Sequence, residues 1–585
     1  MTAAVQTIWA ELIAASLGDA GVTLCVVSPG SRSTPLVAAF AASRLELVTI
    51  IDERTAGFYA LGAARATGKP VALVCTSGSA AAHYLPALVE AAMAHVPLVV
   101  LTANRPPELH DCGASQTIEQ RDLYIGFTRA RFDLGAPVGS ELALRAVRRK
   151  VIQAVTLAQG PDPGPVHLDV PLRKPLEPAA PSTDGERALA ALTYPPALVA
   201  PPVLAGAPAA IAALGRAIAG EPRGVIVAGA MPVGFAAARD AVFALALRAG
   251  YPIVAEAGSQ LRFGPRPDGV CFVDHFDLIP AGHRPAPAIG ICFGAEPVSA
   301  AWPSVAIAAR WVLAGSSWHD GDSTATVILG DVAQAIAAIP EPLADTRRSV
   351  ERAAASAAWL ADWREADARA AAAVTAALAV HPRSEACVMR AAIAALPAGA
   401  IVQIGNSLPI RVVDQVCGAR TQLAVITQRG AAGIDGTLAS AAGATRAGKP
   451  VLVVLGDVSF AHDLGGLLAA RSVAAPLAIL VIDNRGGQIF AGLPIARAEL
   501  GDAFERHWLT LPELDPAAVA TAIGLQAITA ASPAAAASAI EVALAAPGVT
   551  VIHAPVVASG AHDVRRFALA HHVPEPVLAK LGEPT

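Results

Sequence analysis

The chain has 585 residues, 54% of them hydrophobic and 16% charged, with a formal net charge of −5 at pH 7. This length exceeds what one hydrophobic core can organise and predicts about three to four domains. The lack of a basic tract argues against nucleic acid as a partner. The longest uncharged stretches, residues 194–215 and 516–540, are too rich in proline or alanine to predict a membrane span. Seven scattered cysteines without a CxxC pair are typical of reduced thiols in a cytoplasmic protein.

The first segment, to about residue 176, alternates short apolar runs with helical patterns. The predicted strands are 23–27, 47–51, 71–75, 97–102 and 166–170. This alternation predicts a parallel, doubly wound α/β sheet. Nearly every run ends in a loop dense in polar residues or glycine, which favours a site along the carboxyl edge of the sheet. Any single loop of this kind is equally compatible with a helix cap.

Two further α/β units are expected after a proline-rich stretch. The predicted strands of the middle unit are 224–228, 252–255, 288–293 and 311–313, and those of the last unit are 400–404, 423–426, 451–455, 477–482 and 549–553. The middle strands end without convergent charge, which predicts a structural role. The predicted organisation is a first α/β domain at 1–178, a linker at 179–202, a middle α/β domain at 203–344, and a third α/β domain at 345–585 that begins with a helix at 345–380.

The strongest chemical signal lies in the last unit. The apolar run 451–455 ends in Gly456 and Asp457, and the run 477–482 ends in the sequence DNRGG. Parallel strands joined by a helix end at the same edge of a sheet, so Asp457 and Asn484 are expected side by side. A carboxylate, an amide oxygen and a backbone carbonyl suit Mg²⁺, which completes its shell with phosphates. Each half alone is ordinary turn chemistry, but together they favour a metal–diphosphate site.

This pattern resembles the thiamine-diphosphate signature, in which GD is followed further along the chain by an asparagine. That signature often ends in Asn-Asn where this chain has Asp483, but the residue that matches the metal ligand, Asn484, is intact. Glu53 follows the predicted strand 47–51, where a lone carboxylate is usually solvated or caps a helix. Together with the metal motif, Glu53 becomes the candidate group for N1′ of the aminopyrimidine, assisting removal of the thiazolium C2 proton.

Four arginines lie at the ends of predicted strands rather than on helix faces. They are Arg32, Arg105, Arg411 and Arg429. Each one alone is by default a surface arginine. Four of them, in loops of two domains that must converge on one cofactor, suggest polycarboxylate substrates, because guanidinium binds carboxylate bidentately.

Eight motifs extend the resemblance over almost the whole chain. In order they are SPGSRSTPL, DERTAGFYALGAA, TSGSAAAHYLPALVEAA, PLVVLTANRPPEL with GASQTIEQ, GNSLPIR, RGAAGIDG, GDVSFAHDL and NRGGQIF. The chain resembles the family of 2-succinyl-5-enolpyruvyl-6-hydroxy-3-cyclohexene-1-carboxylate synthases of menaquinone biosynthesis. The resemblance implies three α/β domains of the thiamine-diphosphate-enzyme type, the cofactors thiamine diphosphate and Mg²⁺ (or Mn²⁺), and a homodimer or homotetramer with active sites at the subunit interface. It implies that 2-oxoglutarate is decarboxylated and the resulting succinic-semialdehyde carbanion adds 1,4 to isochorismate; both substrates are dicarboxylates.

The resemblance also implies a role for individual residues. Glu53 would contact the aminopyrimidine, and Ile434 would be the apolar wedge that bends the cofactor. The implied metal ligands are Asp457, Asn484 and the Gly486 carbonyl. The other implied cofactor-binding residues are Asn406, Ser407, Gly456, Ser459 and Ile489. The implied substrate-binding residues are Arg32, Arg105, Gln120, Ser407, Arg411, Arg429, Ile489 and Phe490, and of these Arg32, Gln120 and Arg411 join Glu53 as the catalytic group. Many members carry a lysine where this chain has Ala300, so that basic contact is expected to be missing or supplied from elsewhere.

Two other interpretations remain open. Another thiamine-diphosphate-dependent 2-oxoacid decarboxylase or an acetohydroxyacid synthase would leave GNSLPIR and RGAAGIDG together unexplained. A non-catalytic binding protein on the same fold is disfavoured by the intact Glu53, Asp457 and Asn484. The sequence does not distinguish a dimer from a tetramer, or menaquinone from phylloquinone as the end product. It also does not identify the preferred metal or any feedback regulation.

Overall fold

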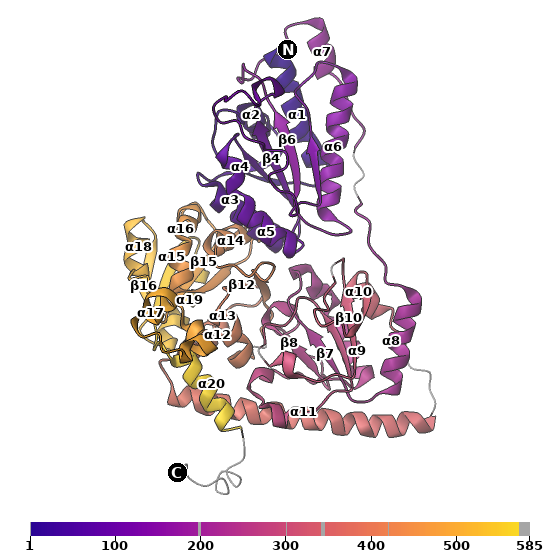
Figure 1. The fold of residues 1–585 in the computed structure, drawn as a ribbon, viewed down its shortest axis with the longest axis vertical. Helices are drawn as coiled ribbons and strands as arrows, with labels where there is room; N and C mark the ends of the chain where they lie inside the picture. Colours follow the sequence, from indigo (N-terminus) through magenta and orange to yellow (C-terminus); the bar gives the residue numbers. More distant parts are fainter. Residues whose placement is uncertain are drawn as a thin grey trace. The chain divides into compact units, whose positions relative to one another are not determined.

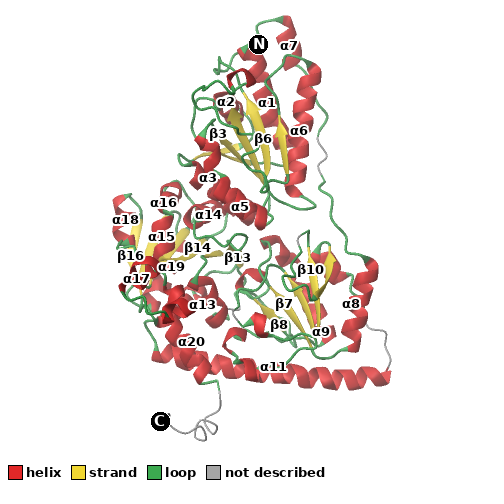
Figure 2. Cartoon of the chain, viewed as in Figure 1, coloured by secondary structure: helices red, strands yellow, loops and turns green. Residues whose placement is uncertain are grey.

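The computed structural model describes residues 2–196, 200–299, 301–316, 318–340, 346–418 and 421–572, with the backbone alone at 346–349. Ala300 therefore lies outside the described residues. The strands form three sheets in which every pairing is parallel, with helices around them (Figure 1, Figure 2). The fold class is the α/β, parallel, doubly wound architecture that the alternating patterns predicted.

The first sheet has the strand order β2-β1-β3-β4-β6-β5. Its strands are β1 (Leu24–Val27), β2 (Glu46–Thr49), β3 (Val71–Cys75), β4 (Leu98–Asn104), β5 (Ala130–Asp133) and β6 (Val166–Pro171). Its helices are α1 (Ala3–Asp19), α2 (Thr34–Ala41), α3 (Glu53–Thr67), α4 (Ser79–His83), α5 (Leu85–Met93) and α6 (Glu141–Gln159). Helices α1, α2 and α6 pack together over one hydrophobic core, whereas α3 contacts α5, β1 and β3. The predicted linker contains a short helix, α7 (Asp184–Ala190).

The middle sheet has five strands in the order β11-β10-β9-β7-β8. They are β7 (Gly224–Ala228), β8 (Ile253–Ala255), β9 (Ile289–Phe293), β10 (Ala309–Ala314) and β11 (Ala325–Leu329). The accompanying helices are α8 (Pro208–Gly220), α9 (Arg239–Ala249) and α10 (Val332–Ala337). The long helix α11 (Thr346–Val380) then leads toward the third sheet (Figure 1). Its residues Trp359 and Trp363 lie in a buried core.

The third sheet repeats the strand order of the first, as β13-β12-β14-β15-β17-β16. Its strands are β12 (Ile401–Ile404), β13 (Ala424–Thr427), β14 (Val451–Gly456), β15 (Leu477–Asp483), β16 (Gln526–Thr529) and β17 (Val549–Pro555). Its helices are α12 (Glu385–Ala394), α13 (Leu408–Val416), α14 (Thr437–Ala444), α15 (Asp457–His462), α16 (Leu464–Ala470), α17 (Asp502–Phe504), α18 (Pro516–Ala522), α19 (Pro533–Ala545) and α20 (Gly560–Ala570). The central strands β14 and β15 are buried almost throughout, as expected for a parallel sheet covered on both faces.

By their internal contacts the residues divide into two compact units. Unit 1 comprises Met1–Val203, Gln428–Gly448 and Asp463–Val473, and unit 2 comprises Leu204–Thr427, Lys449–His462 and Ala474–Thr585. Unit 1 therefore contains the first sheet together with α14 and α16, and unit 2 contains the middle and third sheets. Within the described residues no helix combines the length and the hydrophobicity that crossing a membrane requires.

Helices α3 and α14 cross very closely inside unit 1. A Cβ atom at Gly62 would overlap the carbonyl oxygen of Ser440, and one at Gly443 would overlap that of Tyr59. Glycine is therefore required at both points for the two backbones to meet. This crossing attaches the segment that carries Ile434 to the helix that begins with Glu53.

Three strands were missed by the sequence patterns, and each forms one edge of its sheet. They are β5, β11 and β16. In β5 and β16 no residue is fully buried, and in β11 only Ile328 is. An edge strand packs against one neighbour only, so it can form without the continuous apolar run that marks a central strand.

Candidate active site

The predicted metal ligands lie together at the carboxyl edge of the third sheet. Gly456, at the end of β14, is in register with Ile482 on β15. Asp457 Oδ2 accepts a hydrogen bond of 2.6 Å from the backbone N–H of Gly486, which ties the two strand ends together. Asp457 is 6% exposed, and burial raises the pKa of its carboxyl group, with a further rise from the charge of Asp483. A buried carboxylate with a neighbouring negative charge is well suited to a divalent cation.

The side chain of Asn484 has an oxygen atom that is suited to bind a cation. Its Nδ2 donates a hydrogen bond of 2.9 Å to Oε2 of Glu385, so Oδ1 is the free end of the amide. Asn484 Oδ1 is buried and has no hydrogen-bond partner in the described structure. A buried acceptor without a partner is costly unless a ligand satisfies it. The residues present therefore fit a metal ion held by amide and carboxylate oxygens.

The loop between β15 and the following 3₁₀ helix (Gln488–Gly492) has little room for side chains. Gly486 has φ of +102°, a conformation that favours glycine, and a Cβ there would overlap the carbonyl oxygen of Leu509. Gly487 N–H donates to the same carbonyl at 2.6 Å. Ile489 and Phe490 follow on the 3₁₀ helix and are both half-buried.

The loop after β12 contains backbone strain at a predicted cofactor residue. Ser407 has φ of +72° and ψ of −126°, a region that non-glycine residues rarely occupy. The residue caps α13, and its carbonyl oxygen accepts a hydrogen bond of 2.7 Å from Nη1 of Arg411 one turn later. Asn406, next to it, is 5% exposed. Strain held in place by a buried neighbour is characteristic of ligand-binding loops, and it coincides with the predicted position.

Three predicted substrate residues lie close together in unit 1. Arg32 follows β1, is 3% exposed and donates from Nη1 to the carbonyl of Leu172 at 2.6 Å. Burial lowers the pKa of Arg32, and the nearby positive charge of Arg105 lowers it further. The guanidinium of Arg105 donates to Ser115 O at 3.2 Å and to Gln116 Oε1 at 2.9 Å. Two arginines held this close favour a dianionic ligand, which would relieve their repulsion.

Gln120 is fully buried, and the protein itself uses its amide. Its Oε1 accepts from Gly78 N–H at 3.2 Å, and its Nε2 donates to Ala103 O at 3.2 Å and to Asp169 Oδ1 at 3.4 Å. Asp169 on β6 also accepts from Asn104 Nδ2 at 3.0 Å. In the described structure Gln120 therefore links the ends of β3, β4 and β6.

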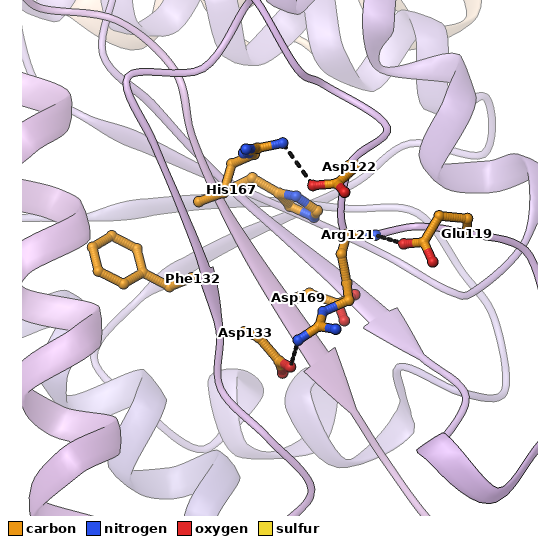
Figure 3. Close-up of a pocket in the computed structure, with 8 residues that line it drawn as sticks. Glu119, Arg121, Asp122, Phe132, Asp133, His167 and Asp169 are labelled. Carbon is orange, nitrogen blue, oxygen red and sulfur yellow. Dashed lines mark hydrogen bonds and ion pairs between the residues drawn. The ribbon is translucent and has the colours of Figure 1, made fainter. Parts of the chain in front are cut away.

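Asp169 also lines a cavity of about 330 Å³ in unit 1 (Figure 3). The lining residues are Glu119, Arg121, Asp122, Arg131, Phe132, Asp133, His167 and Asp169. Its two arginines form ion pairs within the cavity, Arg121 with Asp133 and Arg131 with Asp122 at 2.7 Å. Burial raises the pKa of Asp169 to about 6 and lowers that of His167 to about 4. None of the predicted substrate residues lines this cavity, but Asp169 connects it to Gln120.

Glu53 is the first residue of α3, and Asp52 caps that helix by accepting from Arg54 N–H at 3.0 Å. Glu53 is half-buried, and its carboxylate makes no hydrogen bond or ion pair among the residues that the structure describes. The side chain of Ile51 just before it is 83% exposed. A carboxylate at a helix start, beside an uncovered apolar side chain, is available to a ligand or a partner chain.

The segment with Arg429 and Ile434 is held in unit 1 by two buried carboxylates. Glu90 on α5 accepts from the N–H groups of Gly430 and Ala431, at 3.1 and 2.6 Å, and pairs with Arg65. Asp463 accepts from Leu438 and Ala439 N–H, at 2.7 and 3.1 Å, at the start of α14. Both ends of the segment are thus anchored through its backbone.

The predicted residues fall into two groups when the two units are considered separately. Unit 1 contains Glu53, Arg32, Arg105, Gln120, Arg429 and Ile434; unit 2 contains Asn406, Ser407, Arg411, Gly456, Asp457, Ser459, Asn484, Gly486, Ile489 and Phe490. Ser459 lies on α15, 5% exposed, two residues after Asp457. Most residues of each group follow the strands of one sheet. Arg429 and Ile434 lie outside the first sheet but belong to the same unit as that sheet.

Four buried carboxylates next to these residues were missed by sequence reasoning. They are Glu90, Asp169, Glu385 and Asp463. Each holds a predicted residue or the segment around it. Glu90 and Asp463 lie inside the motifs TSGSAAAHYLPALVEAA and GDVSFAHDL, which predicted no role for them, whereas Asp169 and Glu385 lie outside the eight motifs. For Glu385 the local signal was Ser384 before it, a helix cap whose Oγ accepts from Cys387 N–H.

Comparison with known proteins assigns the cofactor. Residues 9–123 match the model for the N-terminal thiamine-pyrophosphate-binding domain of thiamine pyrophosphate enzymes, and residues 409–554 match the C-terminal one. A 2-succinyl-5-enolpyruvyl-6-hydroxy-3-cyclohexene-1-carboxylate synthase from Sorangium cellulosum is 40% identical over 539 residues, covering 88% of this chain and 87% of the relative. Proteins of the same name from Geobacillus kaustophilus (40% identical, 87% of this chain and 88% of the relative) and Halobacterium salinarum (39%, 84% and 85%) match similarly.

A likeness to solved structures supports the fold alone. The crystal structure of benzoylformate decarboxylase from Polynucleobacter necessarius superposes with a TM-score of 0.69 at 17% identity, covering 94% of this chain and 98% of that chain. Together with the two matched domain models, the three-sheet architecture is that of a thiamine-diphosphate enzyme.

Proposed function

The chain belongs to the family of 2-succinyl-5-enolpyruvyl-6-hydroxy-3-cyclohexene-1-carboxylate synthases, and we propose that it performs that family's reaction on 2-oxoglutarate and isochorismate. Thiamine diphosphate, when bound, supplies the carbon nucleophile and the electron sink for loss of CO₂ from the 2-oxo acid. The four-carbon fragment left after decarboxylation then adds 1,4 to isochorismate. The product would enter menaquinone biosynthesis.

The observation that carries this proposal is that the chain has two chemically different sites, one in each unit. In unit 2 the unpartnered Oδ1 of Asn484 and the carboxylate of Asp457 suit a diphosphate-bound Mg²⁺ or Mn²⁺, together with the Gly486 carbonyl. In unit 1 the neighbouring guanidinium groups of Arg32 and Arg105 suit the carboxylates of a dianionic substrate. An enzyme for apolar 2-oxo acids would have little use for such a pair.

The other residues have roles that the family resemblance implies. Glu53 would place a carboxylate for proton transfer with the aminopyrimidine, and Ile434 would support the cofactor. Arg411 and Arg429 would orient substrate carboxylates. The amide of Gln120 is buried and bonded to Gly78, Ala103 and Asp169, so Gln120 would instead hold the end of β4 that leads to Arg105. Holding both acids in register with the reacting carbon supplies much of the acceleration. Asn406, Ser407, Gly456, Ser459, Ile489 and Phe490 shape the pocket around the cofactor.

We further propose a cytoplasmic homodimer or homotetramer with active sites shared between subunits. Glu53 and Asp457 lie in different compact units of the chain, which agrees with a site that is shared between subunits. Mixing the inactive variants Glu53→Gln and Asp457→Asn tests the sharing, because a mixed dimer then contains one intact site. Recovery of activity on mixing is expected; two variants that stay inactive after subunit exchange would show that each site is built from one chain.

A mass balance tests the reaction itself. The enzyme is supplied with Mg²⁺, thiamine diphosphate and 2-oxoglutarate, with and without isochorismate. Release of CO₂ is expected to depend on isochorismate and to equal the amount of adduct formed, with no pyruvate set free. Equal CO₂ release from pyruvate without an acceptor would instead favour a general 2-oxoacid decarboxylase or an acetohydroxyacid synthase, and no release from either acid would favour a non-catalytic protein.

A further inference from the structure

The buried carboxyl group of Glu385 has no role in the reaction described so far. Glu385 is 1% exposed and lies 99 positions before Asn484, yet its Oε2 is 2.9 Å from the Nδ2 atom of that residue. We propose that Glu385 is a positioning residue for the metal site, and that it turns the amide of Asn484 so that Oδ1 is presented to the divalent cation. The inference rests on the proposed function, because the cation is the one that holds the diphosphate.

The reason lies in the symmetry of an asparagine side chain. The oxygen and nitrogen ends of the amide have nearly the same size, so packing alone does not decide which end faces the cation. The Oε2 atom of Glu385 accepts a hydrogen bond from the amide and therefore selects its NH₂ end. With the amide turned round, two oxygens would meet in a buried place and the NH₂ group would point at the cation. Glu385 thus excludes the orientation that cannot bind metal.

The unpartnered oxygen is the second observation behind this assignment. Asn484 Oδ1 is buried without a hydrogen-bond partner in the described structure. Asp457 lies at the same edge, close enough for its charge to act on Glu385. Hydrogen-bond partners behind metal ligands commonly fix ligand orientation in this way.

Glu385 is also held on a rigid element. It is the first residue of α12, whose cap is the Ser384 hydroxyl accepting from Cys387 N–H at 3.3 Å. Helix α12 packs against α13, α19 and α20 within unit 2. A group that must select one of two amide orientations benefits from such support, because a mobile carboxylate could follow either.

The test is a double-mutant cycle on metal binding. Mn²⁺ is the probe, and free Mn²⁺ is measured by electron paramagnetic resonance in the presence of thiamine diphosphate. The proteins are the wild type, Glu385→Met, Asn484→Asp and the double variant. Glu385→Met is expected to weaken Mn²⁺ binding about 10–100-fold, the range for loss of a ligand's hydrogen-bond partner. With aspartate at position 484 the same change should cost little, since a carboxylate presents an oxygen whichever way it turns.

The isosteric Glu385→Gln variant gives an independent comparison. A glutamine still offers one acceptor oxygen to Asn484, so it should retain most of the Mn²⁺ affinity that methionine loses. Equal losses with glutamine and methionine would overturn the proposal, as would a methionine cost that is the same with asparagine and aspartate at 484. If Glu385→Met does not fold, the glutamine change is measured in both backgrounds and should cost more with asparagine.

Two controls separate this inference from the proposed function. Arg390→Gln alters an exposed residue of the same helix and should leave Mn²⁺ binding unchanged. A wild-type protein that binds no Mn²⁺ with thiamine diphosphate would contradict the proposed function. A wild type that binds, with no coupling between positions 385 and 484, would contradict only the role of Glu385.

Discussion

The first and third sheets have the same strand order, yet their carboxyl edges carry opposite chemistry. In the first sheet the loops after β1 and β4 present the guanidinium groups of Arg32 and Arg105. In the third sheet the loops after the corresponding strands β12 and β15 present Ser407 and Asn484. Topology determines where a ligand can sit, and the loop residues determine which ligand it is.

Both edges share one constructional feature, a buried carboxylate that accepts a hydrogen bond from a buried side-chain amide. Asp169 lies behind Gln120 and Asn104 in the first sheet, and Glu385 lies behind Asn484 in the third. Each receives an N–H bond from a side-chain amide and so leaves that amide in one orientation. The difference is that Gln120 is fully satisfied by protein groups, whereas Asn484 keeps an oxygen without a partner.

The largest effect is expected from Glu53→Gln, at the first sheet. Removing the carboxylate removes proton transfer, and we expect turnover to fall by about 10²–10⁴-fold, whereas thiamine diphosphate still binds. The measurement is product formation together with calorimetric cofactor binding. Glu11→Gln, an exposed carboxylate of the same unit, is the control. Wild-type turnover in Glu53→Gln would remove this residue from the reaction.

Asp457→Asn should weaken cofactor binding at the carboxyl edge of the third sheet and leave substrate binding at the first sheet unchanged. Loss of a charged ligand is worth about 3 kcal/mol, so we expect the apparent Kd for thiamine diphosphate with Mg²⁺ to rise about 100-fold. With saturating cofactor the KM for 2-oxoglutarate should change little. Asp502→Asn, which changes an exposed carboxylate of the same unit, is the control. A rise in KM without a change in cofactor affinity would contradict the division between the two edges.

Arg105→Gln should weaken substrate binding at the carboxyl edge of the first sheet and leave cofactor binding at the third sheet unchanged. A charge-assisted hydrogen bond contributes about 1.5–3 kcal/mol, so kcat/KM for the dicarboxylate substrates should fall about 10–100-fold while cofactor affinity is kept. Arg105→Lys is expected to lie in between, because lysine retains the charge but not the bidentate geometry. Arg121→Gln, an exposed arginine paired with Asp133, serves for comparison and should have little effect.

The smallest effect is expected in the pH dependence of stability. Burial raises the pKa of the Asp169 carboxyl group from its ordinary value of 3.8 to about 6. The folded protein therefore binds this proton more tightly than the unfolded chain, and stability falls as pH rises from about 4 to about 6. In Asp169→Asn, the loss of unfolding free energy between pH 4 and pH 6 should be smaller by up to about 3 kcal/mol. Denaturant unfolding of both proteins across this range measures it, with exposed Asp122→Asn as control; an unchanged slope would show that Asp169 does not titrate there.

The central strands of all three sheets could be predicted from the sequence, to within two residues at most ends. Val71–Cys75 and Gly224–Ala228 have the predicted bounds, because a strand buried on both faces must be a continuous apolar run. The edge strands β5, β11 and β16 could not, because their half-exposed residues lack that pattern.

The part of the site that directly follows the strands could be predicted from the sequence. Asp457, Asn484 and Gly486 were placed together by the spacing of one β-α-β unit, and the structure does bring them together. The state of Gln120 was not foreseeable, since its partners Gly78, Ala103 and Asp169 come from three separate strand ends.

The sequence by itself determined the fold class, the cofactor signature and the family, because these depend on local periodicity and on motifs a few residues long. The tertiary structure alone decided which groups hold those motifs in place. Glu385 reaches Asn484 across 99 positions, and Glu90 reaches Ala431 across 341. Such contacts arise only when helices from different parts of the chain pack against the sheets, and no local pattern records them.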